Sequence, residues 1–327
     1  MRIAIIVPTS AAPRSGNRHT AARWCDFLRG LGHRVRVLTR WRSGNDDLLL
    51  ALHARKSFDS ILRFSEVKPS APIVVALTGT DLYRDIRTSA EAKQSLGLAA
   101  RLVVLQKEGM RELSKFLRQK TNVVHQSSDV TLRHAPDGSR FRVAVIGHLR
   151  SEKDPFRAVM ALRRIERSVP IEVLQVGGAL DRDMRKRCRV WEKLEPRYHW
   201  LGSVSHGTAM RRLASSHALV VSSIMEGGAN VICEAARIGV PVLASRVPGN
   251  IGMLGRDYPG YFPLGDEAAL ARLIERARKD VSFYRRLKGA VSRRSSLFAP
   301  KAERVALERA LRAALRDAKP AYVRVRR

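Results

Sequence analysis

Cysteine, aromatic residues and long apolar runs are all scarce in this sequence. The 327 residues include three Cys, at positions 25, 188 and 233, and no CxxC pair. That spacing excludes a disulfide framework and gives no support to a zinc site, so we expect buried thiols. No apolar run approaches the roughly 18 residues of a membrane span, and the first one, residues 3–7, is too short for a signal-peptide core. We therefore expect a cytoplasmic protein with no membrane partner.

Acidic residues are few beside the basic ones. There are 30 Asp and Glu against 61 Lys and Arg, a formal net charge of +31. A positive field of this size suits nucleic acids, anionic membranes or polyanionic small ligands, and composition alone does not separate these classes. Proteins that bind single-stranded nucleic acid interleave aromatic side chains with basic ones, but only 6% of the residues are aromatic. We therefore expect no nucleic-acid partner.

Short apolar runs, many of them rich in β-branched residues, recur along the chain with helical patterns between them. Because the runs are continuously apolar, they predict strands buried on both faces of a parallel sheet. The predicted strands are 3–7, 35–39, 48–52, 73–77, 102–105 and 122–124 in the first half, and 143–147, 171–176, 199–201, 218–222, 241–245 and 261–264 in the second. Helices are predicted over residues 17–31 and 107–118, and a polar, turn-rich linker at 134–140 separates the halves.

This alternation predicts an α/β protein with two doubly wound, Rossmann-like domains. We place the N-terminal domain at residues 1–140, the C-terminal domain at 141–300, and a final helix with a basic tail at 301–327. Apolar residues on a helical period at 301–317 predict an amphipathic helix that must bury its apolar stripe. Ligands of such sheets bind outside the carboxyl ends of the strands, so the loops there are the first places to look for a site.

One loop of the second domain carries two carboxylates and two glycines. Glu226, Gly227 and Gly228 precede a helix expected to begin near Asn230, and Glu234 follows Glu226 by eight positions. Glycines let the backbone approach a ligand closely, and a helix N-terminus offers free amides to a diphosphate. Both carboxylates can accept hydrogen bonds from the hydroxyls of one elongated ligand. An arbitrary Glu pair would instead be a loop acid and an acid on a helix surface.

The chain resembles the retaining GT-B glycosyltransferases of family 4. Glu226 and Glu234 match that family's E-x7-E motif, and segments 201–202, 218–223 and 235–245 match its surroundings. The resemblance covers the whole chain and implies a GT-B fold, two Rossmann-like domains facing a cleft, with the last helix crossing back to the first domain. It implies that Glu226 contacts the donor sugar as a catalytic residue and that Glu234 binds the ribose of the nucleotide. The backbone that would hold sugar and phosphate is that of Gly227, Gly228, Ala229, Asn230 and Val231.

The resemblance extends to the loop after residues 143–147. There the family has Gly-Arg and then Lys, and the two cations neutralise the departing diphosphate, acting where charge develops. Gly147 and Lys153 match this pattern, whereas His148 stands where the family usually has Arg. We assign Gly147 and His148 to donor binding, and Lys153 to catalysis together with Arg150, the candidate replacement for the missing Arg. No metal and no other cofactor is expected, because these cations would do the work of Mg²⁺.

Three loops of the first domain hold candidate acceptor ligands. The candidates are Ser15, Gly16, Asn17 and Arg18 in the first loop, His53, Arg55 and Lys56 in the second, and Thr80 and Asp81 in the third. Arg, Lys and Asn donors in such loops favour an anionic acceptor. The family usually has a His near the third loop, where Asp81 is the only titratable side chain here. A lone His such as His53 is more often structural than catalytic, although its neighbours Arg55 and Lys56 favour an anion.

Several strings, in order, resemble the selenosugar synthases of selenoneine biosynthesis. They are S-G-N-R at 15–18, A-L-H-A-R-K-S at 51–57, A-L-T-G-T-D-L-Y-R-D at 76–85, G-H-L-R-x-x-K-D-P-F-R at 147–157 and E-G-G-A-N-V at 226–231. The resemblance implies transfer of a sugar from a UDP-sugar, UDP-N-acetylglucosamine or UDP-glucose, to the selenium of selenophosphate, with loss of phosphate to give a 1-selenosugar. Such an anionic selenium nucleophile needs no general base, so the missing His matters little.

An ordinary family 4 transferase remains the alternative, with an oxygen acceptor in polysaccharide or glycolipid synthesis. It would share the donor site. An oxygen nucleophile favours a general base, and a lipid acceptor favours an exposed apolar patch. The sequence leaves open the preferred sugar, the stereochemistry and the oligomeric state.

Overall fold

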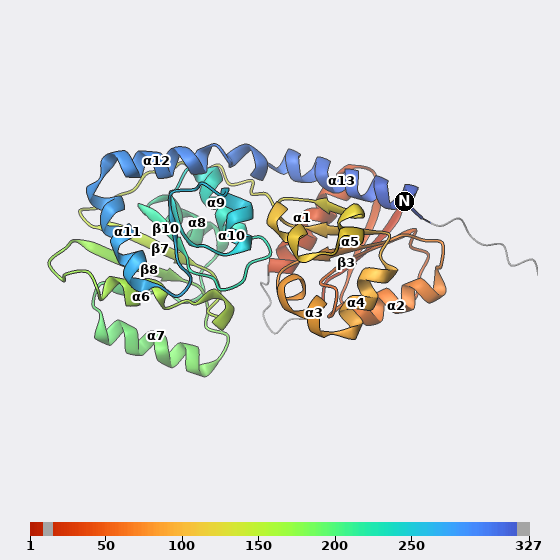
Figure 1. The fold of residues 1–327 in the computed structure, drawn as a ribbon, viewed down its shortest axis with the longest axis horizontal. Helices are drawn as coiled ribbons and strands as arrows, with labels where there is room; N and C mark the ends of the chain where they lie inside the picture. The colour runs from red at the N-terminus through yellow and green to blue at the C-terminus, as the bar shows by residue number, and fades with distance from the viewer. Residues whose placement is uncertain (9–15, 319–327) are drawn as a thin grey trace, which may run out of the picture. The chain divides into compact units, whose positions relative to one another are not determined.

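The computed structural model of this protein describes residues 1–8 and 16–318. The chain divides into two compact units (Figure 1). Unit 1 comprises Met1–Gln126 and Lys301–Arg327, and unit 2 comprises Ser127–Pro300. The second unit begins before the predicted boundary at residue 141, because the linker pairs with it through its backbone: the N–H of Ser128 donates to Phe298 and that of His134 to Ile238.

Unit 1 is built on a sheet of six parallel strands in the order β2-β1-β3-β4-β5-β6. The strands are β1 (Arg2–Ile6), β2 (Arg34–Leu38), β3 (Leu48–Leu52), β4 (Ile73–Leu77), β5 (Arg101–Val104) and β6 (Thr121–Val123). The helices are α1 (Gly16–Gly30), α2 (Phe58–Val67), η1 (Asp81–Asp85), α3 (Ile86–Thr88), α4 (Ala90–Leu98), η2 (Lys107–Glu112) and α5 (Lys115–Gln119). Every residue of β3 and β4 is buried, which explains why these two runs are continuously apolar.

Unit 2 has a second six-stranded parallel sheet, in the order β12-β11-β10-β7-β8-β9. The strands are β7 (Phe141–Ile146), β8 (Ile171–Val176), β9 (Tyr198–Trp200), β10 (Ala218–Val221), β11 (Val242–Ser245) and β12 (Tyr261–Phe262). The helices are η3 (Ser151–Lys153), α6 (Arg157–Leu162), α7 (Arg182–Leu194), α8 (His206–Ala214), α9 (Asn230–Ile238), α10 (Pro248–Leu254), α11 (Glu267–Lys279), α12 (Val281–Ser292) and η4 (Ser295–Phe298).

The two strand orders fix where ligands are expected in each unit. In unit 2 the chain runs from β7 outward to β9 and then returns to place β10 on the other side of β7. In unit 1 it likewise places β2 and β3 on opposite sides of β1. Doubly wound sheets bind ligands at the carboxyl ends of the strands at such a switch point. The switch points therefore lie between β7 and β10 in unit 2 and between β1 and β3 in unit 1.

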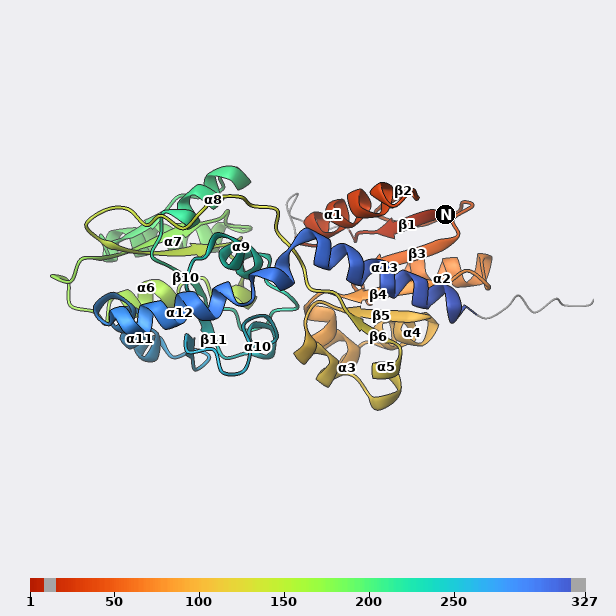
Figure 2. The ribbon, with the colours of Figure 1, turned by 90° about the horizontal axis from the view of Figure 1, so that it is seen from above.

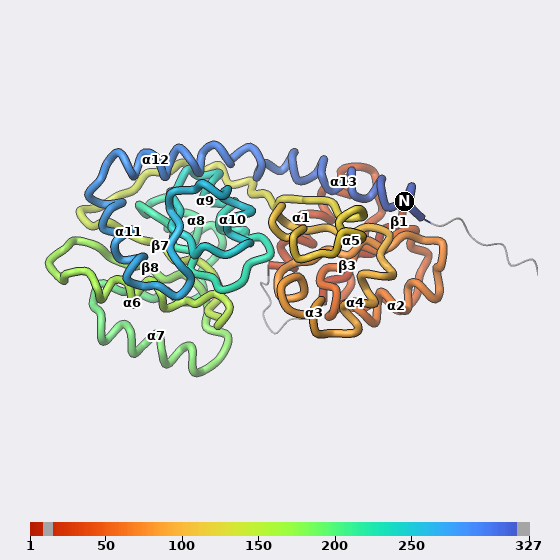
Figure 3. Tube along the Cα trace, viewed as in Figure 1, coloured from red at the N-terminus to blue at the C-terminus, as the bar shows by residue number. Residues whose placement is uncertain are grey.

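The last helix, α13 (Pro300–Arg316), packs on unit 1, as Figures 2 and 3 show. Its Leu307 and Leu311 are buried in the same apolar cluster as Trp24 of α1. Glu303, 1% exposed, accepts hydrogen bonds from Arg23 Nε (2.6 Å) and Trp24 Nε1 (2.7 Å). A buried carboxylate is tolerated only with such partners. The predicted return of the amphipathic helix to the first domain is therefore confirmed.

One predicted helix, residues 107–118, is two short helices instead, η2 and α5. The N–H of Leu113 donates to the carbonyl of Met110, which closes the first helix. The hydroxyl of Ser114 then accepts from the N–H of Leu117 (3.4 Å) and caps a new helix. The cap interrupts a pattern whose apolar spacing alone favoured one continuous helix.

The three cysteines are buried free thiols, as predicted. Burial raises the pKa of Cys188 to about 11, which makes that thiol unreactive. Across residues 1–8 and 16–318, none of the helices combines the length and the apolar composition needed to cross a bilayer.

Candidate active site

The loops after β7 and β10 are tied together at the switch point of unit 2. The hydroxyl of Ser222 donates to the backbone carbonyls of Lys153 (3.1 Å) and Asp154 (2.8 Å). The N–H of Ile224 donates to the carbonyl of Glu152 (2.9 Å). Two segments about seventy residues apart in the sequence thus form one surface at the carboxyl edge of the sheet.

Lys153 and Glu226 meet across these loops. The Lys153 ammonium and Glu226 Oε1 form an ion pair, and the hydroxyl of Ser223 donates to the same oxygen at 2.6 Å. The Glu226 side chain is 7% exposed, whereas that of Lys153 is 39% exposed. A buried carboxylate needs such partners, because an unpaired charge out of water is costly. The Lys153 side chain, unlike that of Glu226, is partly exposed to solvent.

Two glycines that the sequence analysis did not single out shape these loops by close backbone contact. A Cβ on Gly249 would lie 1.9 Å from the carbonyl oxygen of Glu226. A Cβ on Gly177, whose φ is +148°, would lie 1.9 Å from the carbonyl oxygen of Gly147. Only glycine fits such contacts. The available signal was positional, since Gly177 directly follows β8 and Gly249 lies in the first turn of α10.

A small hollow at this edge separates His148 from Arg150, the two candidates to replace the Arg that family 4 transferases usually have after Gly147. Among the residues that line it are Gly147, His148, Lys153, Glu226 and Val231. Arg150 is not one of the described residues lining the hollow. Its Nε is buried, with no hydrogen-bond partner in the part of the chain that the structure describes. His148 thus lines the same hollow as Lys153 and Glu226, whereas Arg150 does not line it among the described residues.

Helix α9 begins directly after this loop with its amides uncapped. Gly227 and Gly228 lead into Ala229, the N-cap residue, which offers no side-chain cap. The Oδ1 atom of Asn230 is buried, with no hydrogen-bond partner within residues 1–8 and 16–318. Free amides and the helix dipole attract anions. In the described residues no group of three or more His, Cys, Asp or Glu side chains is arranged to hold a metal ion.

Glu234 lies further along α9 and has a histidine partner. Its Oε1 is 2.8 Å from Nε2 of His206, at the start of α8. This hydrogen bond raises the pKa of His206, outweighing burial, which lowers it; the charge of Asp129 adds to the rise. The sequence analysis missed His206, whose only signal was its place after the strand at residues 199–201.

The candidate acceptor residues lie at the carboxyl ends of β1, β3 and β4 in unit 1. Ser15 falls outside the described residues, and Gly16, Asn17 and Arg18 form the first turn of α1. Gly16 and Arg18 are exposed. Among the described residues, no hydrogen bond links these three to the loops after β3 and β4. The structure therefore joins the second and third predicted loops to each other, and of the first loop it describes only residues 16–18.

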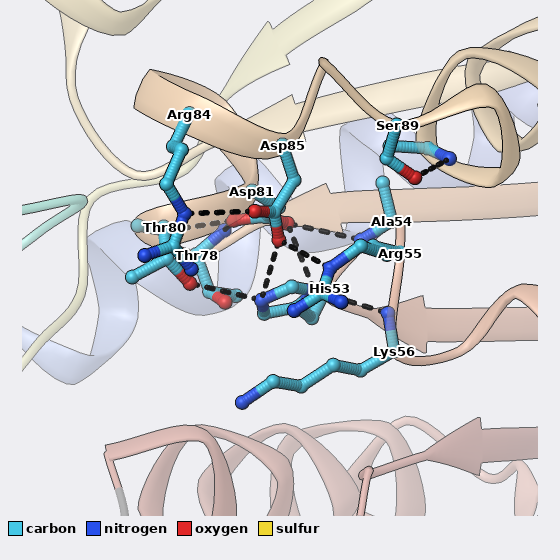
Figure 4. A network of polar contacts seen from close by, with 12 residues as sticks. His53, Ala54, Arg55, Lys56, Thr78, Thr80, Asp81, Arg84, Asp85 and Ser89 are labelled. Carbon is cyan, nitrogen blue, oxygen red and sulfur yellow. Dashed lines mark hydrogen bonds and ion pairs between the residues drawn. The ribbon is translucent and has the colours of Figure 1, made fainter. Parts of the chain in front are cut away.

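His53 lies at the centre of a network that joins the loops after β3 and β4 (Figure 4). The residue is buried, with a left-handed backbone (φ 82°). Its Nδ1 accepts the N–H of Lys56 at 3.2 Å, and its Nε2 lies 3.0 Å from Oγ1 of Thr80. Burial lowers the pKa of His53, and the nearby charge of Asp81, which raises it, does not compensate. The ring is therefore neutral at physiological pH.

Asp81, a predicted acceptor ligand, connects the loops after β3 and β4 through its carboxylate. Its side chain is fully buried. Oδ2 accepts from the N–H of Ala54 (3.0 Å), and Oδ1 accepts from those of Thr78 and Gly79 (2.9 Å each). Both oxygens are thus used by backbone amides, which fasten the loop after β4 to the loop after β3.

Asp85, which the sequence analysis did not single out, organises the cations of this edge. It accepts from Arg55 Nε (2.9 Å) and Arg84 Nε (3.0 Å), and its Oδ2 is 3.7 Å from Nε2 of His53. Burial would raise its pKa, but hydrogen bonds from the two guanidinium groups outweigh burial and lower it. Lys56 is exposed, with no acidic partner among the described residues. The missed signal was spacing, since Asp85 follows Asp81 by about one helical turn.

Comparison with known proteins identifies the part of the chain that holds the Lys153–Glu226 pair. Residues 132–293 match the family model described as "Glycosyl transferases group 1". They belong to that family. The enzyme is therefore a glycosyltransferase, and the E-x7-E segment of Glu226 and Glu234 lies within the matched residues.

Solved structures show that this glycosyltransferase has the GT-B fold, as predicted. Sucrose-phosphate synthase from Thermosynechococcus elongatus is 17% identical with a TM-score of 0.78, over 95% of this chain and 98% of that one. Anabaena HepE in complex with UDP-glucose is 15% identical with a TM-score of 0.75, over 96% and 100% of the chains. A glycosyltransferase from Rickettsia africae is 14% identical with a TM-score of 0.73, over 98% and 99%. At these identities the likeness shows the fold alone.

Proposed function

We propose that this glycosyltransferase moves a sugar, N-acetylglucosamine or glucose, from a UDP-sugar to the selenium of selenophosphate. Selenium would attack C1 of the sugar as the bond from C1 to the diphosphate oxygen breaks and UDP leaves. Water would then cleave the P–Se bond, releasing phosphate and a 1-selenosugar. The observation that carries the donor half is the Lys153–Glu226 pair at the switch point of unit 2.

The donor would be held by unit 2. The diphosphate would meet the free amides of α9 and the Lys153 ammonium, where negative charge develops as UDP leaves. Glu226 would contact the sugar, and Glu234 the ribose hydroxyls. Anabaena HepE has the same fold and was solved with UDP-glucose, which supports a UDP-sugar donor. The proposed reaction needs no metal, so activity should survive EDTA.

The chemistry of unit 1 supports an anionic acceptor. Arg55, Lys56 and Arg84 place cationic groups at the carboxyl ends of β3 and β4, and only two of the three are held by Asp85. His53 is not poised as a general base, because Nδ1 already accepts an amide proton and Nε2 faces a hydroxyl. An alcohol acceptor would gain from such a base, whereas a selenophosphate anion would not need it.

Anaerobic incubation of the purified chain with UDP-N-acetylglucosamine or UDP-glucose tests the proposal. Each reaction is run with selenophosphate, with inorganic phosphate, and with neither. UDP release is followed by chromatography, and selenium-containing products by mass spectrometry. We expect a selenosugar only with selenophosphate, and no selenosugar from Glu226→Gln.

The outcomes separate the two halves of the proposal. If UDP binds and no selenosugar forms, the acceptor is wrong and a group 1 transferase with an oxygen acceptor becomes the better interpretation. If neither UDP nor a UDP-sugar binds, the donor assignment of unit 2 is wrong as well.

A further inference from the structure

We propose that Thr80 binds an anionic oxygen of the acceptor through its hydroxyl proton, and that His53 is the positioning residue that makes this proton available. The inference rests on the proposed function, because the anionic oxygen would be one of those on the phosphorus of the acceptor. It deepens the proposed function by naming Thr80 as the residue that recognises a negatively charged oxygen of the acceptor. It also changes the role of His53, which the sequence placed among the acceptor ligands.

The hydrogen bonds of His53 determine its tautomer. Nδ1 lies 3.2 Å from the backbone nitrogen of Lys56, which can only donate, so Nδ1 carries no proton. In a neutral imidazole the proton is then on Nε2. Nε2 is 3.0 Å from Oγ1 of Thr80, so the ring donates and the hydroxyl oxygen accepts.

This direction of donation leaves the Thr80 hydroxyl with a proton to give. A hydroxyl has one proton and can accept as well as donate, and His53 uses only an acceptor position. Within residues 1–8 and 16–318, Thr80 Oγ1 has no other hydrogen-bond partner. Thr80 is half-buried at the carboxyl end of β4, near the cations held by Asp85 (Figure 4). A hydroxyl whose proton is free to donate suits a ligand with acceptor oxygens, and a charged oxygen most of all.

Burial keeps the ring neutral and is the largest influence on its pKa. Asp81 and Asp85 face the ring from η1, with carboxylate oxygens 4.0 Å from Nδ1 and 3.7 Å from Nε2, and their charges favour protonation. Lys56 and Arg55 face it from the loop after β3 and oppose protonation. Protonation would put a proton on Nδ1 against the Lys56 amide and break that bond. His53 therefore acts through Thr80 and not as a proton carrier.

Four variants separate these roles through binding of inorganic phosphate to the full chain saturated with UDP, measured by calorimetry. Thr80→Val removes the hydroxyl at constant shape and should raise the Kd for phosphate about tenfold, the scale of a hydrogen bond to a charged group. Thr80→Ser should stay within about twofold. His53→Asn puts an amide oxygen in place of the Nδ1 that accepts from Lys56, and Asn tolerates the left-handed backbone. Its shorter side chain cannot reach Thr80, so the Kd should rise about fivefold. His53→Gln can still donate to Thr80 and should lose less.

The decisive readout is the double variant. If His53 acts through Thr80, His53→Asn added to Thr80→Val should weaken phosphate binding no further, whereas a merely structural role would give additive losses. His33→Asn, a histidine of the same unit outside this network, is the matched control. UDP affinity, which belongs to unit 2, should be unchanged in all variants. An unchanged circular dichroism spectrum and melting temperature show that unit 1 is folded in each of them.

The results distinguish this inference from the proposed function. Wild-type protein that binds no phosphate, phosphate binding unaffected by Thr80→Val, or additive losses would each overturn the roles given to Thr80 and His53, even if a selenosugar forms. Conversely, Thr80-dependent phosphate binding without selenosugar formation would support the oxyanion site and overturn selenophosphate as the acceptor.

Discussion

The carboxyl edges of the two sheets occupy equivalent places in similar folds but are built differently. The edge of unit 2 depends mainly on backbone. Gly177 and Gly249 pack against loop carbonyls, and α9 begins with free amides, while one serine hydroxyl and one ion pair cross the loops. The edge of unit 1 depends on buried side chains, with Asp81 holding the loops and Asp85 holding the cations. A backbone scaffold suits a diphosphate of constant geometry, whereas a side-chain scaffold can be altered one residue at a time to suit a different acceptor.

The largest effect is expected from Lys153→Ala, which removes the cation at the carboxyl edge of unit 2, the proposed donor edge. Because a charge aimed at the leaving diphosphate acts mainly in the transition state, kcat should fall about a thousandfold. The Kd for UDP should change much less. Lys193→Ala, which removes an exposed cation of α7, is the matched control and should leave kcat unchanged. A tenfold or smaller fall for Lys153→Ala would show that backbone amides alone carry the charge stabilisation.

A glycine substitution tests whether the donor edge depends on backbone contact. In Gly249→Ala the new methyl group cannot coexist with the carbonyl oxygen of Glu226, so that loop must move. Displacement of a reacting group by about 1 Å can cost about a hundredfold in rate. The expected result is a loss of this size together with weaker UDP binding and a lower melting temperature. Gly207→Ala in α8, where the new Cβ would meet only Arg211 Nη1 at an ordinary contact distance of 3.6 Å among the described residues, should change none of the three. Equal rates, UDP affinities and melting temperatures for the two variants would contradict the view that the edge of unit 2 depends on close backbone contact.

A smaller effect should distinguish His148 from Arg150. His148 lines the hollow beside Lys153, so His148→Ala should lower kcat/KM about tenfold, the scale of one hydrogen bond to a charged group. Arg150→Ala should lower it less than about threefold. Steady-state rates with varied UDP-sugar provide the measurement. The reverse order would mean that Arg150 turns into the hollow when the donor binds, and that the original assignment of Arg150 to catalysis was right.

The fold and the place of the glycine loop before α9 could be predicted from the sequence, whereas the contacts at the carboxyl edge of unit 1 could not, for a physical reason. Buried parallel strands need continuous apolar runs, and a diphosphate loop needs glycines before a helix, so both leave local patterns. The roles of Asp81 and Asp85 depend instead on which backbone amides and guanidinium groups the tertiary structure brings to each carboxylate. Likewise, nothing local shows that His53 faces Thr80, 27 residues away. The split of residues 107–118 into two helices depends on the Ser114 cap, which apolar spacing does not show.

The smallest predicted effect concerns His206, and it tests whether Glu234 binds ribose. The hydrogen bond from His206 to Glu234 raises the pKa of the histidine above its ordinary value. If the ribose hydroxyls of UDP take the Glu234 oxygens, that pKa should fall when UDP binds. The UDP-bound state then holds fewer protons, so UDP affinity should rise as the pH rises through the pKa of His206. We expect a rise of about twofold, because the His206 side chain is 58% exposed and solvent screens its charge. NMR titration of the His206 ring with and without UDP measures the shift, and His206→Gln should flatten the pH dependence. A His206 pKa that UDP leaves unchanged would show that ribose does not compete with His206 for Glu234. The pair of His206 and Glu234 would then be a side-chain contact that shapes the edge of unit 2, as Asp81 and Asp85 shape the edge of unit 1.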